Sequence, residues 1–354
     1  MGSKPEYLKK MKLNLLVGNE KRFFEFIKNL TDKDKIAVLS HNDGDGVCSA
    51  AITSKVIGKV DYLGILNYQQ DMLSGLIKEL QEKKINKIII LDLALFDEKS
   101  YIKEFEKFSE ILVVDHHPFK ENLNSEKTVF LKAPSEIPVS YMCYYLFSKV
   151  QEIPSWLAAL GTLSDIAYKY TKENAEQIYD GFEFLGKKKN LWEDVLTLTM
   201  AVVYFKERAN EIYDLLMKAK GVEDLGEIKV YAKIVEDEIK YYLKDFEKKK
   251  EESKDLVFYY YTSTYSINSI IINIVSVKEK SKTFIFVNKL DGTLRISSRR
   301  QDGKVNCNEL LREAIKKIPN ASAGGHKGAA GARLSEEYFE KFKKNLLKFY
   351  KKII

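Results

Sequence analysis

Histidine is rare in this chain, and every histidine stands in a short cluster with aspartate or glycine. The 354 residues include four histidines, which are His41, His116, His117 and His326. Imidazole binds metals and exchanges protons near neutral pH. Histidines confined to such clusters, rather than scattered over charged helical stretches, therefore indicate chemistry.

The first cluster, from His41 to Gly46, places one imidazole and two carboxylates in a single short loop. The carboxylates are those of Asp43 and Asp45. Side chains two positions apart in an extended segment point the same way, and Gly44 and Gly46 allow the tight backbone that brings them together. Such ligands suit manganese, iron or zinc, whereas carboxylates alone suit magnesium. In an equally consistent structural alternative, Asp43 or Asp45 caps the helix that follows.

Further acidic groups and imidazoles follow apolar segments. Asp92 comes directly after one apolar run, and taken alone it could be a turn or cap residue. Asp115, His116 and His117 come directly after another run. A packed core would have to satisfy all three of these polar groups, which favours a functional role. Asp165 ends an apolar helical segment, where by itself it could be an ordinary polar residue.

Together these segments contain enough ligands for two divalent metals that share one aspartate. The ligands expected for the first metal are His41, Asp43 and Asp92. The ligands expected for the second metal are Asp45, Asp92, His116 and Asp165. Two metals about 3.5–4 Å apart can activate water and neutralise charge on a phosphorus centre. Mn²⁺ is the expected ion, with Mg²⁺ as the alternative.

The segments between these clusters alternate between short apolar runs and helical patterns. Buried strands are predicted over residues 35–40, 60–66, 87–91 and 111–114, and helices over residues 46–57, 72–83 and 98–108. This alternation is typical of a parallel sheet with helices on both faces. Ligands of such sheets bind beyond the carboxyl ends of the strands, so the clusters after the first, third and fourth strands are expected to meet at one edge.

Helical patterns dominate the flanks of this region. Helices are predicted over residues 1–30, with a break near Gly18, and over residues 139–150 and 155–163. Residues 170–243 have few strand patterns and are predicted to be helical. Residues 244–254 are almost wholly charged, which is typical of a helix end that continues into a linker.

A second α/β pattern occupies the C-terminal part. Its strands are predicted over residues 255–262, 283–289 and 293–299, and its helices over residues 267–277, 307–317 and 336–350. Asp291-Gly292 lies between the last two strands and predicts a tight hairpin. The expected fold class is α/β, with an N-terminal parallel-sheet domain (1–170), a helical insertion (171–254) and a smaller C-terminal α/β domain (255–354).

The four N-terminal clusters resemble, in chain order, the motifs of the DHH phosphoesterase superfamily. They are HNDGDG at residues 41–46, the aspartate of ILDLAL at 92, the DHH triplet at 115–117, and GTLSD ending at 165. The superfamily includes RecJ-type nucleases, oligoribonucleases, cyclic-dinucleotide phosphodiesterases and one class of inorganic pyrophosphatase. The resemblance implies the division of metal ligands given above, with His117 on the substrate phosphate and Asp115 as a supporting or proton-carrying group. The short H-x-D spacing disfavours the pyrophosphatase branch.

Two further segments resemble the DHH-associated domain that follows in that superfamily. RISSR ends at Arg299, and GGHKGAAG occupies residues 324–331. They are similar to its substrate-binding strand and its glycine-rich loop. The resemblance implies that substrate is bound by Ser298, Arg299, Gly324, Gly325 and His326. Glycines let backbone N–H groups approach a phosphate, and arginine can bind one with two hydrogen bonds. A flexible loop without a ligand is the alternative.

Composition limits the class of protein. The formal net charge is +7, which favours polyanionic partners, although lysine-rich helix faces are often merely solvated. The cysteines, Cys48, Cys143 and Cys307, are far apart and are expected to be buried small residues rather than a zinc site or disulfides. No run approaches the ~20 apolar residues of a membrane span, and the N-terminus lacks a signal-like apolar core. A cytoplasmic protein is therefore expected.

The leading functional hypothesis is an exonuclease on single-stranded DNA or RNA. Single-stranded nucleic acid would be the main partner, with replication or repair proteins and a second copy of the chain as further possible partners. Residues 259–261 are tyrosines that could stack on bases, although a half-buried aromatic strand is the simpler interpretation. One alternative is an oligoribonuclease or dinucleotide phosphodiesterase. Another is an inactive scaffold in a replication or repair complex.

Overall fold

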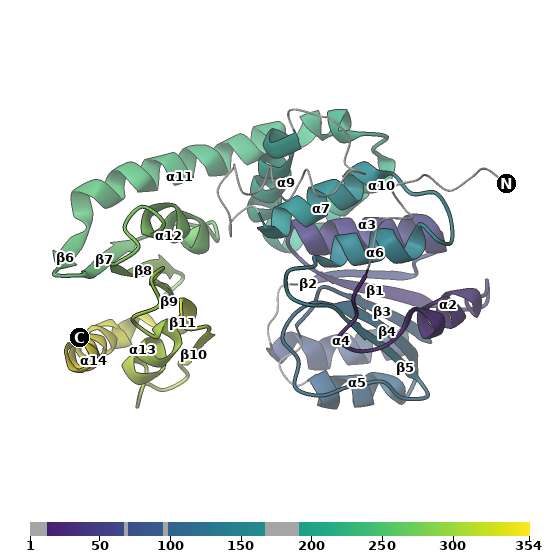
Figure 1. Cartoon of the computed structure of the whole chain (residues 1–354), viewed down its shortest axis with the longest axis horizontal. Coiled ribbons are helices and arrows are strands. Elements are labelled where there is room, and N and C mark those ends of the chain that lie inside the picture. Colours follow the sequence, from purple (N-terminus) through teal and green to yellow (C-terminus); the bar gives the residue numbers. More distant parts are fainter. Residues whose placement is uncertain (1–12, 67–69, 95–97, 167–190) are drawn as a thin grey trace. The chain divides into compact units, whose positions relative to one another are not determined.

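The computed structural model describes residues 13–66, 70–94, 98–166 and 191–354 (Figure 1). The chain divides into two compact units, Met1–Lys233 and Ile234–Ile354, and the division falls within helix α11 (Lys229–Lys249). Both units combine helices with a sheet, so the predicted α/β class is confirmed. The domain limits at residues 170 and 254 stay predictions.

The first unit is built on a five-stranded parallel sheet in the order β2-β1-β3-β4-β5 (Figure 1). The strands are β1 (Ile36–His41), β2 (Tyr62–Leu66), β3 (Lys87–Leu91), β4 (Glu110–Asp115) and β5 (Thr128–Lys132). Four of them were predicted. The sequence analysis missed β5, a short apolar run that pairs in parallel with β4 and forms the far edge of the sheet.

Helices cover both faces of this sheet, as its apolar strands require (Figure 1). One face packs against α3 (Gly44–Ile57), α6 (Val139–Phe147) and α7 (Ser155–Ile166), and the other against α4 (Gln70–Glu82) and α5 (Glu98–Glu106). Strand β1 shows the division, because Val38 joins the first core and Leu39 the second.

The helical segment that was predicted as an insertion adds to the first of these two cores. Its described elements in the first unit are α9 (Leu191–Phe205), η2 (Lys206–Arg208), α10 (Asn210–Lys218) and η3 (Val222–Ile228). Leu198, Ile212 and Leu225, one from each of α9, α10 and η3, are buried in the core that α3 and α7 share. The part of this segment that the structure describes is therefore integral to the unit.

The N-terminal prediction is only partly correct. Helix α2 (Glu20–Lys28) is capped by Asn19, but the residues just before it are not helical. The backbone N–H groups of Leu16 and Val17 donate to the carbonyl of Lys132, and Val17 forms an antiparallel bridge with that residue. The open edge of β5 offers hydrogen bonds that outweigh the local helical pattern. The predicted helix over residues 1–12 lies outside the described residues.

The second unit contains a six-stranded mixed sheet in the order β10-β11-β9-β8-β7-β6. The strands are β6 (Glu251–Ser253), β7 (Leu256–Tyr261), β8 (Thr283–Leu290), β9 (Thr293–Arg299), β10 (Ser322–Gly325) and β11 (Ala329–Ser335). The helices are α12 (Asn268–Ser276), α13 (Cys307–Ala314), η4 (Glu336–Tyr338) and α14 (Phe339–Ile353). Asp291 and Gly292 have φ of 50° and 70°, which confirms the predicted tight hairpin.

One expectation for this unit is corrected, and for two of the three tyrosines the simpler interpretation is confirmed. The charged run after Lys249 is not a linker, because residues 251–253 form β6 and pair with β7. Tyr259 and Tyr261 are buried and stack on each other with ring centroids 5.1 Å apart, so they are not available to bases. Tyr259 donates to Asp245 and Tyr261 to Asn268, which satisfies both hydroxyls inside the unit.

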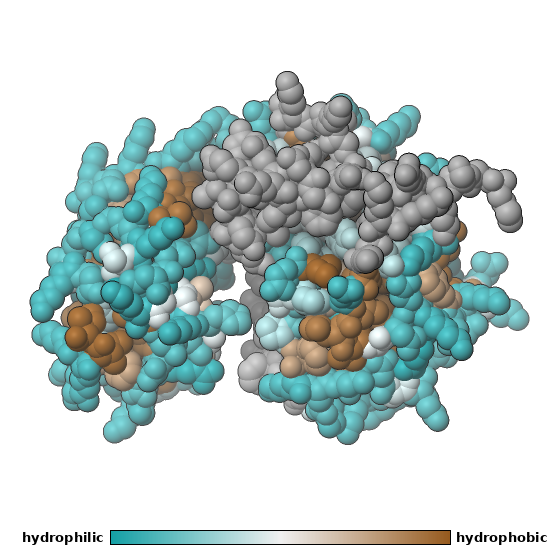
Figure 2. Space-filling view, viewed as in Figure 1, coloured by the Kyte–Doolittle hydropathy of each residue, from teal (hydrophilic) through white to brown (hydrophobic). Residues whose placement is uncertain are grey.

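The surface in view in Figure 2 is mainly hydrophilic, with smaller hydrophobic areas. Within the described part of the chain, no helix is long and apolar enough to cross a membrane. The three cysteines are buried and unpaired, as the sequence predicted.

Two glycines, one in a tightly packed position and one in an open position, test how closely the helices of the first unit pack. A Cβ on Gly161 of α7 would lie 2.6 Å from the Cβ of Ser140 and 2.8 Å from that of Cys48, whereas a Cβ on Gly75 of α4 would meet nothing within 4 Å. Gly161→Ala should lower the free energy of unfolding by ~1–3 kcal/mol through overpacking. Gly75→Ala should raise it by ~0.5–1 kcal/mol through helix propensity. Urea unfolding of both variants checks the opposite signs; equal effects would contradict the packing argument.

Candidate metal centre

The predicted ligands gather at one edge of the parallel sheet. His41 is the last residue of β1, Asp92 follows β3, and Asp115 ends β4. These three strands are neighbours in the sheet, so their carboxyl ends lie side by side. The edge predicted from the strand pattern is therefore the one at which the polar groups meet.

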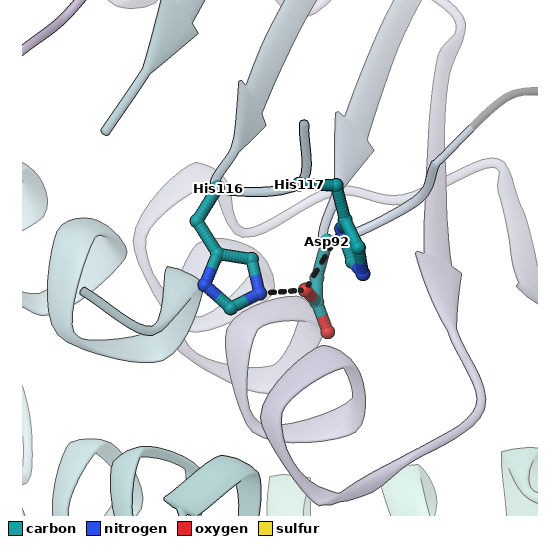
Figure 3. A group of neighbouring side chains, drawn as sticks. All are labelled: Asp92, His116 and His117. Atoms are coloured by element: carbon teal, nitrogen blue, oxygen red, sulfur yellow. Dashed lines mark ion pairs between the residues drawn. The ribbon is translucent and has the colours of Figure 1, made fainter. Parts of the chain in front are cut away.

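Two groups of side chains at this edge have the geometry of a metal site, and they share Asp92. One group is His41, Asp43 and Asp92. The other is Asp92, His116 and His117, drawn in Figure 3. In each group, one potential ligand atom from every residue lies within 4.8 Å of the others. Asp92, as the residue common to both groups, is the one that could serve a metal in either of them.

Asp92 is a buried carboxylate without a hydrogen bond. It is 1% exposed, and neither of its oxygens accepts a hydrogen bond from any described residue. His116 Nε2 and His117 Nδ1 lie 3.3 and 3.8 Å from Asp92 Oδ1, without hydrogen-bonding geometry (Figure 3). Its φ of 55° is a left-handed conformation that aspartate tolerates. Buried polar atoms are almost always satisfied, so a divalent cation fits these two oxygens.

The charges around Asp92 also favour a bound cation. Burial raises the pKa of Asp92 well above its usual value, and the charges of Asp43, Asp45, Asp115 and Asp165 raise it further. An uncompensated cluster of carboxylates favours protonation or cation binding. The donor set of carboxylates and imidazoles suits Mn²⁺ and similar ions.

Asp43 performs two tasks. It is the N-cap of α3, where its Oδ1 accepts a 2.9 Å hydrogen bond from the backbone N–H of Gly46. Its Oδ2 lies 2.9 Å from His41 Nδ1. The capping interpretation and the ligand interpretation are therefore compatible. Both contacts overcome the effect of burial and hold the pKa of Asp43 well below its usual value.

Asp45 is held by the first turn of α6. Its two oxygens accept hydrogen bonds of 2.7 and 2.8 Å from the backbone N–H groups of Val139 and Ser140. Each oxygen keeps a second lone pair that could still bind a metal. Burial and then the charges of Asp165 and Asp43 raise the pKa of Asp45. Asp165 lies on α7, half-buried.

The second predicted ligand set is brought together only in part. Asp92 and His116 share a candidate group with His117, and not with Asp45 or Asp165. The division of the ligands between two metals therefore stays a prediction.

Close packing explains the glycines of the first motif. A Cβ on Gly44 would lie 2.4 Å from that of Ser164, the residue before Asp165, and a Cβ on Gly46 would lie 2.2 Å from the carbonyl oxygen of His41. Because Gly44 and Gly46 have no side chains, the first turn of α3 can pack against α7 and lie close to the end of β1.

Lys132 is a site residue that the sequence analysis missed. It is the last residue of β5, opposite Asp115 in the parallel register, and it is 0% exposed. Its Nζ donates to Asp115 Oδ2 and to the backbone carbonyl of His117, the latter at 3.1 Å. The only sequence signal was a lysine at the end of a short apolar run.

The pair formed by Lys132 and Asp115 orients His117. Asp115 Oδ1 lies 2.8 Å from His117 Nδ1. Burial alone would raise the pKa of Asp115, but the hydrogen bond with His117 and the charge of Lys132 hold it well below its usual value. An ionised carboxylate only accepts, so His117 Nδ1 carries the proton and Nε2 remains for another partner.

The C-terminal motifs lie side by side in the second sheet. Strand β9 pairs with β11, which sets Arg299 opposite Ala329 and Ser298 opposite Ala330. The predicted glycine-rich loop is instead a β-hairpin, because cross-strand hydrogen bonds extend along it; Gly324 and Gly325 belong to β10.

The predicted substrate residues of this unit differ in accessibility. His326 is exposed in the turn of the hairpin, and its backbone bonds with Ala329. Arg299 is half-buried, and its Nε donates to Asn273 at 2.7 Å. Ser298 is fully buried on the other face of the sheet. Its predicted contact with substrate, like those of Arg299, Gly324, Gly325 and His326, stays a prediction.

A double-mutant cycle tests the pair of Lys132 and Asp115. Lys132→Met leaves a buried carboxylate without its cation and should lower the free energy of unfolding by ~3–5 kcal/mol. Asp115→Asn combined with Lys132→Met removes both charges and should be less destabilised than the single variant. Urea unfolding of the metal-free protein at neutral pH measures both.

Lys87→Met provides the matched control. Lys87 is also a buried lysine on a strand of this sheet, but its partner Glu110 is about half exposed, so the loss should be ~0–1 kcal/mol. The cycle would contradict the assignment if the double variant were as unstable as Lys132→Met.

Models of two protein families match the chain. The DHH family, N-terminal domain, matches residues 35–179, and the DHHA1 domain matches residues 256–352. The two ranges cover most of the chain and contain every predicted site residue. Among curated proteins, none matches the chain.

Solved structures share the fold. RecJ from Thermus thermophilus in complex with Mn²⁺ has a TM-score of 0.69 and 16% identity over 96% of this chain and 55% of its own, so the chain spans about half the length of that protein. An exonuclease RecJ bound to manganese has a TM-score of 0.67 and 16% identity, covering 98% of this chain and 96% of its own. CDC45 from Entamoeba histolytica has a TM-score of 0.61 and 11% identity, covering 93% and 98%.

At these identities the solved structures establish the fold, and the family models establish which two domains the chain contains. The metal-site geometry lies within the first matched domain, and the paired strand and hairpin lie within the second. The chain therefore contains the N-terminal domain of the DHH family, followed by a DHHA1 domain.

Proposed function

We propose that this protein is a metal-dependent phosphodiesterase that removes nucleotides from an end of single-stranded DNA or RNA. The proposal is carried by Asp92, a buried carboxylate with no hydrogen bond, which belongs to both candidate metal groups. The DHH and DHHA1 domains, the RecJ-like fold and the net charge of +7 support a nucleic acid as the substrate.

We expect His41, Asp43, Asp92 and His116, which are members of the two candidate groups, to hold metal. Asp45 and Asp165 are the further ligands that the family resemblance implies. Bound divalent ions would neutralise charge on the phosphate and activate water. The side chains of the protein hold one another in position at this site. Lys132 and Asp115 fix the ring of His117 with a proton on Nδ1, so Nε2 can accept a proton and, once it carries one, donate it to a phosphate oxygen or to the leaving group.

A scaffold in a replication or repair complex is the second candidate, because the fold is also that of CDC45. The clustered carboxylates and imidazoles argue against it, since an inactive scaffold gains nothing from a buried carboxylate whose oxygens accept no hydrogen bond from the described residues. Cleavage decides between the two candidates.

The test uses end-labelled single strands of DNA and RNA, of two and of about twenty nucleotides, incubated with the protein and Mn²⁺. Stepwise shortening of the long strands would establish the exonuclease and give its polarity. Cleavage of the dinucleotides alone would instead identify an oligoribonuclease-like enzyme. Absence of any cleavage by the folded, metal-loaded protein would leave the scaffold.

Asp92→Asn should separate stability from metal binding. Asparagine tolerates the left-handed backbone and keeps the shape, but it cannot take the negative charge with which a carboxylate binds a cation. The metal-free variant should melt at the same temperature as the wild type or higher, while the stabilisation by Mn²⁺ and all cleavage are lost. Asp32→Asn, at an exposed aspartate of the same unit, is the control and should change neither property. Retention of Mn²⁺-dependent melting by Asp92→Asn would refute the metal assignment.

Metal binding should release protons. The raised pKa values of Asp45 and Asp92 mean that both carboxyls tend to hold protons in the metal-free protein, and a cation must displace them. Affinity for Mn²⁺ should therefore rise as the pH rises from mildly acidic to mildly alkaline. Calorimetric titrations in buffers of different ionisation enthalpy measure both the affinity and the protons released. An affinity that does not vary with pH would exclude these ligands.

A further inference from the structure

One face of the second sheet carries three arginines along two neighbouring strands. The side chains of β9 alternate strictly, with Leu294, Ile296 and Ser298 buried and the residues between them half-exposed. The buried set faces the core formed with α13 and α14. Arg295 and Arg299 therefore lie on the opposite face.

The pairing register extends this face across β11 and β10. Residues opposite each other in antiparallel strands share a face, and Arg333 lies opposite Arg295. Between the arginines lie small residues, with Ser297 opposite Gly331 and Gly331 opposite Gly324. Helix α12 covers the β8 side of this face through Asn268 and Asn273, but Gly324, Gly331 and Arg333 are exposed. We call this strip, from Arg299 to Arg295 and Arg333, the arginine face.

The charges on the arginine face are not compensated within the unit. Among the described residues, no carboxylate forms an ion pair with any of its three arginines. Arg295 donates to the hydroxyl of Ser266, and Arg299 donates to Asn273 and to a backbone carbonyl. Like charges directly opposite each other destabilise a strand pair, so Arg295 and Arg333 cost stability in the free protein.

Arg300, which follows Arg299 in the sequence, is an arginine whose guanidinium stabilises the fold. Arg300 is 4% exposed and forms ion pairs with Asp255 and Asp302 at 2.8 and 2.7 Å. It also donates to Thr283. The contrast indicates that the uncompensated arginines serve a ligand rather than the fold.

We infer that the arginine face binds the phosphate backbone of a single strand at least two phosphates long. Arg299 and Arg295 are four residues apart on a strand, or about 13 Å. One internal phosphate cannot serve both positions, so a dinucleotide would reach only one of them. His326 lies at the Arg299 end, because its backbone pairs with Ala329. Because the exposed glycines between the arginines have no side chains, the surface of the arginine face is flat there. This inference rests on the proposed function for the identity of the polyanion as a nucleic acid.

The test compares Arg295→Gln combined with Arg333→Gln against a charge-matched control. The control is Arg312→Gln combined with Lys316→Gln, two exposed cations in and just after α13, on the other side of the sheet. Binding of a fluorescent, phosphorothioate-linked single strand of about twenty nucleotides to the Mn²⁺-loaded protein is followed by anisotropy over a range of salt concentrations. KM and kcat are measured on the unmodified strand and on a dinucleotide.

The arginine variant should bind the long strand about tenfold more weakly, and the slope of log affinity against log salt should fall by about 1.4, as expected for the loss of two phosphate contacts. KM for the long strand should rise, whereas kcat and dinucleotide cleavage should not change. The thermal stability of the arginine variant should be equal to that of the wild type or higher, because the repulsion between the two guanidiniums is relieved. If the two arginines instead stabilised the fold, the variant would be less stable.

Binding of the long strand as in the wild type or the control would overturn the inference, and so would an equal loss on the dinucleotide. The two proposals fail separately. Arginine-dependent binding without any cleavage would keep the arginine face and reject the nuclease. Cleavage with arginine-independent binding would do the reverse.

Discussion

Several carboxylates are buried within a short distance of one another at the edge of the parallel sheet, and their mutual repulsion is the constraint on which the first unit depends. The structure compensates three of them by different means. Asp43 has an imidazole and a helix-start N–H, Asp45 has two N–H groups of α6, and Asp115 has the buried Lys132. Asp92, by contrast, accepts no hydrogen bond from the part of the chain that the structure describes. The remaining negative charge is concentrated where two candidate metal groups overlap.

The packing of the helices follows from this edge. Asp45 accepts hydrogen bonds from the amides of α6. Gly44 allows the first turn of α3 to lie close to α7, and Gly161 allows α7 to lie close to α3 and α6. The apolar cores on both faces of the sheet then supply the stability that offsets burying charge. Natural sites commonly sacrifice local stability in this way where function requires it.

The second unit also contains both compensated and uncompensated charges, but there the charges are positive. Arg300 is neutralised by two aspartates and helps to hold the unit together, whereas the arginines of the arginine face form no ion pair with any described carboxylate. One unit therefore presents buried negative charge suited to metal ions, and the other presents positive charge suited to phosphates. Both arrangements leave charge uncompensated until a ligand is present.

The sequence by itself determined the elements and the clusters that follow them. Apolar runs and helical periodicity are local patterns, so four strands of the parallel sheet, most helices and the hairpin at Asp291 were predictable. The position of His41, Asp92 and Asp115 at one edge also followed, because parallel strands end together.

Tertiary structure decided what depends on neighbours distant in the chain. Strand β5 and Lys132 matter only through their register with β4, and Ser298 faces the core only because of the way β9 packs on α13. The extended start before α2 depends on the free edge of β5, and the glycine-rich segment pairs as a hairpin rather than a loop. The opposition of Arg295 and Arg333 likewise exists only in the paired sheet. Hydrogen bonding between strands and burial of side chains are non-local, so no local pattern of residue types could specify them.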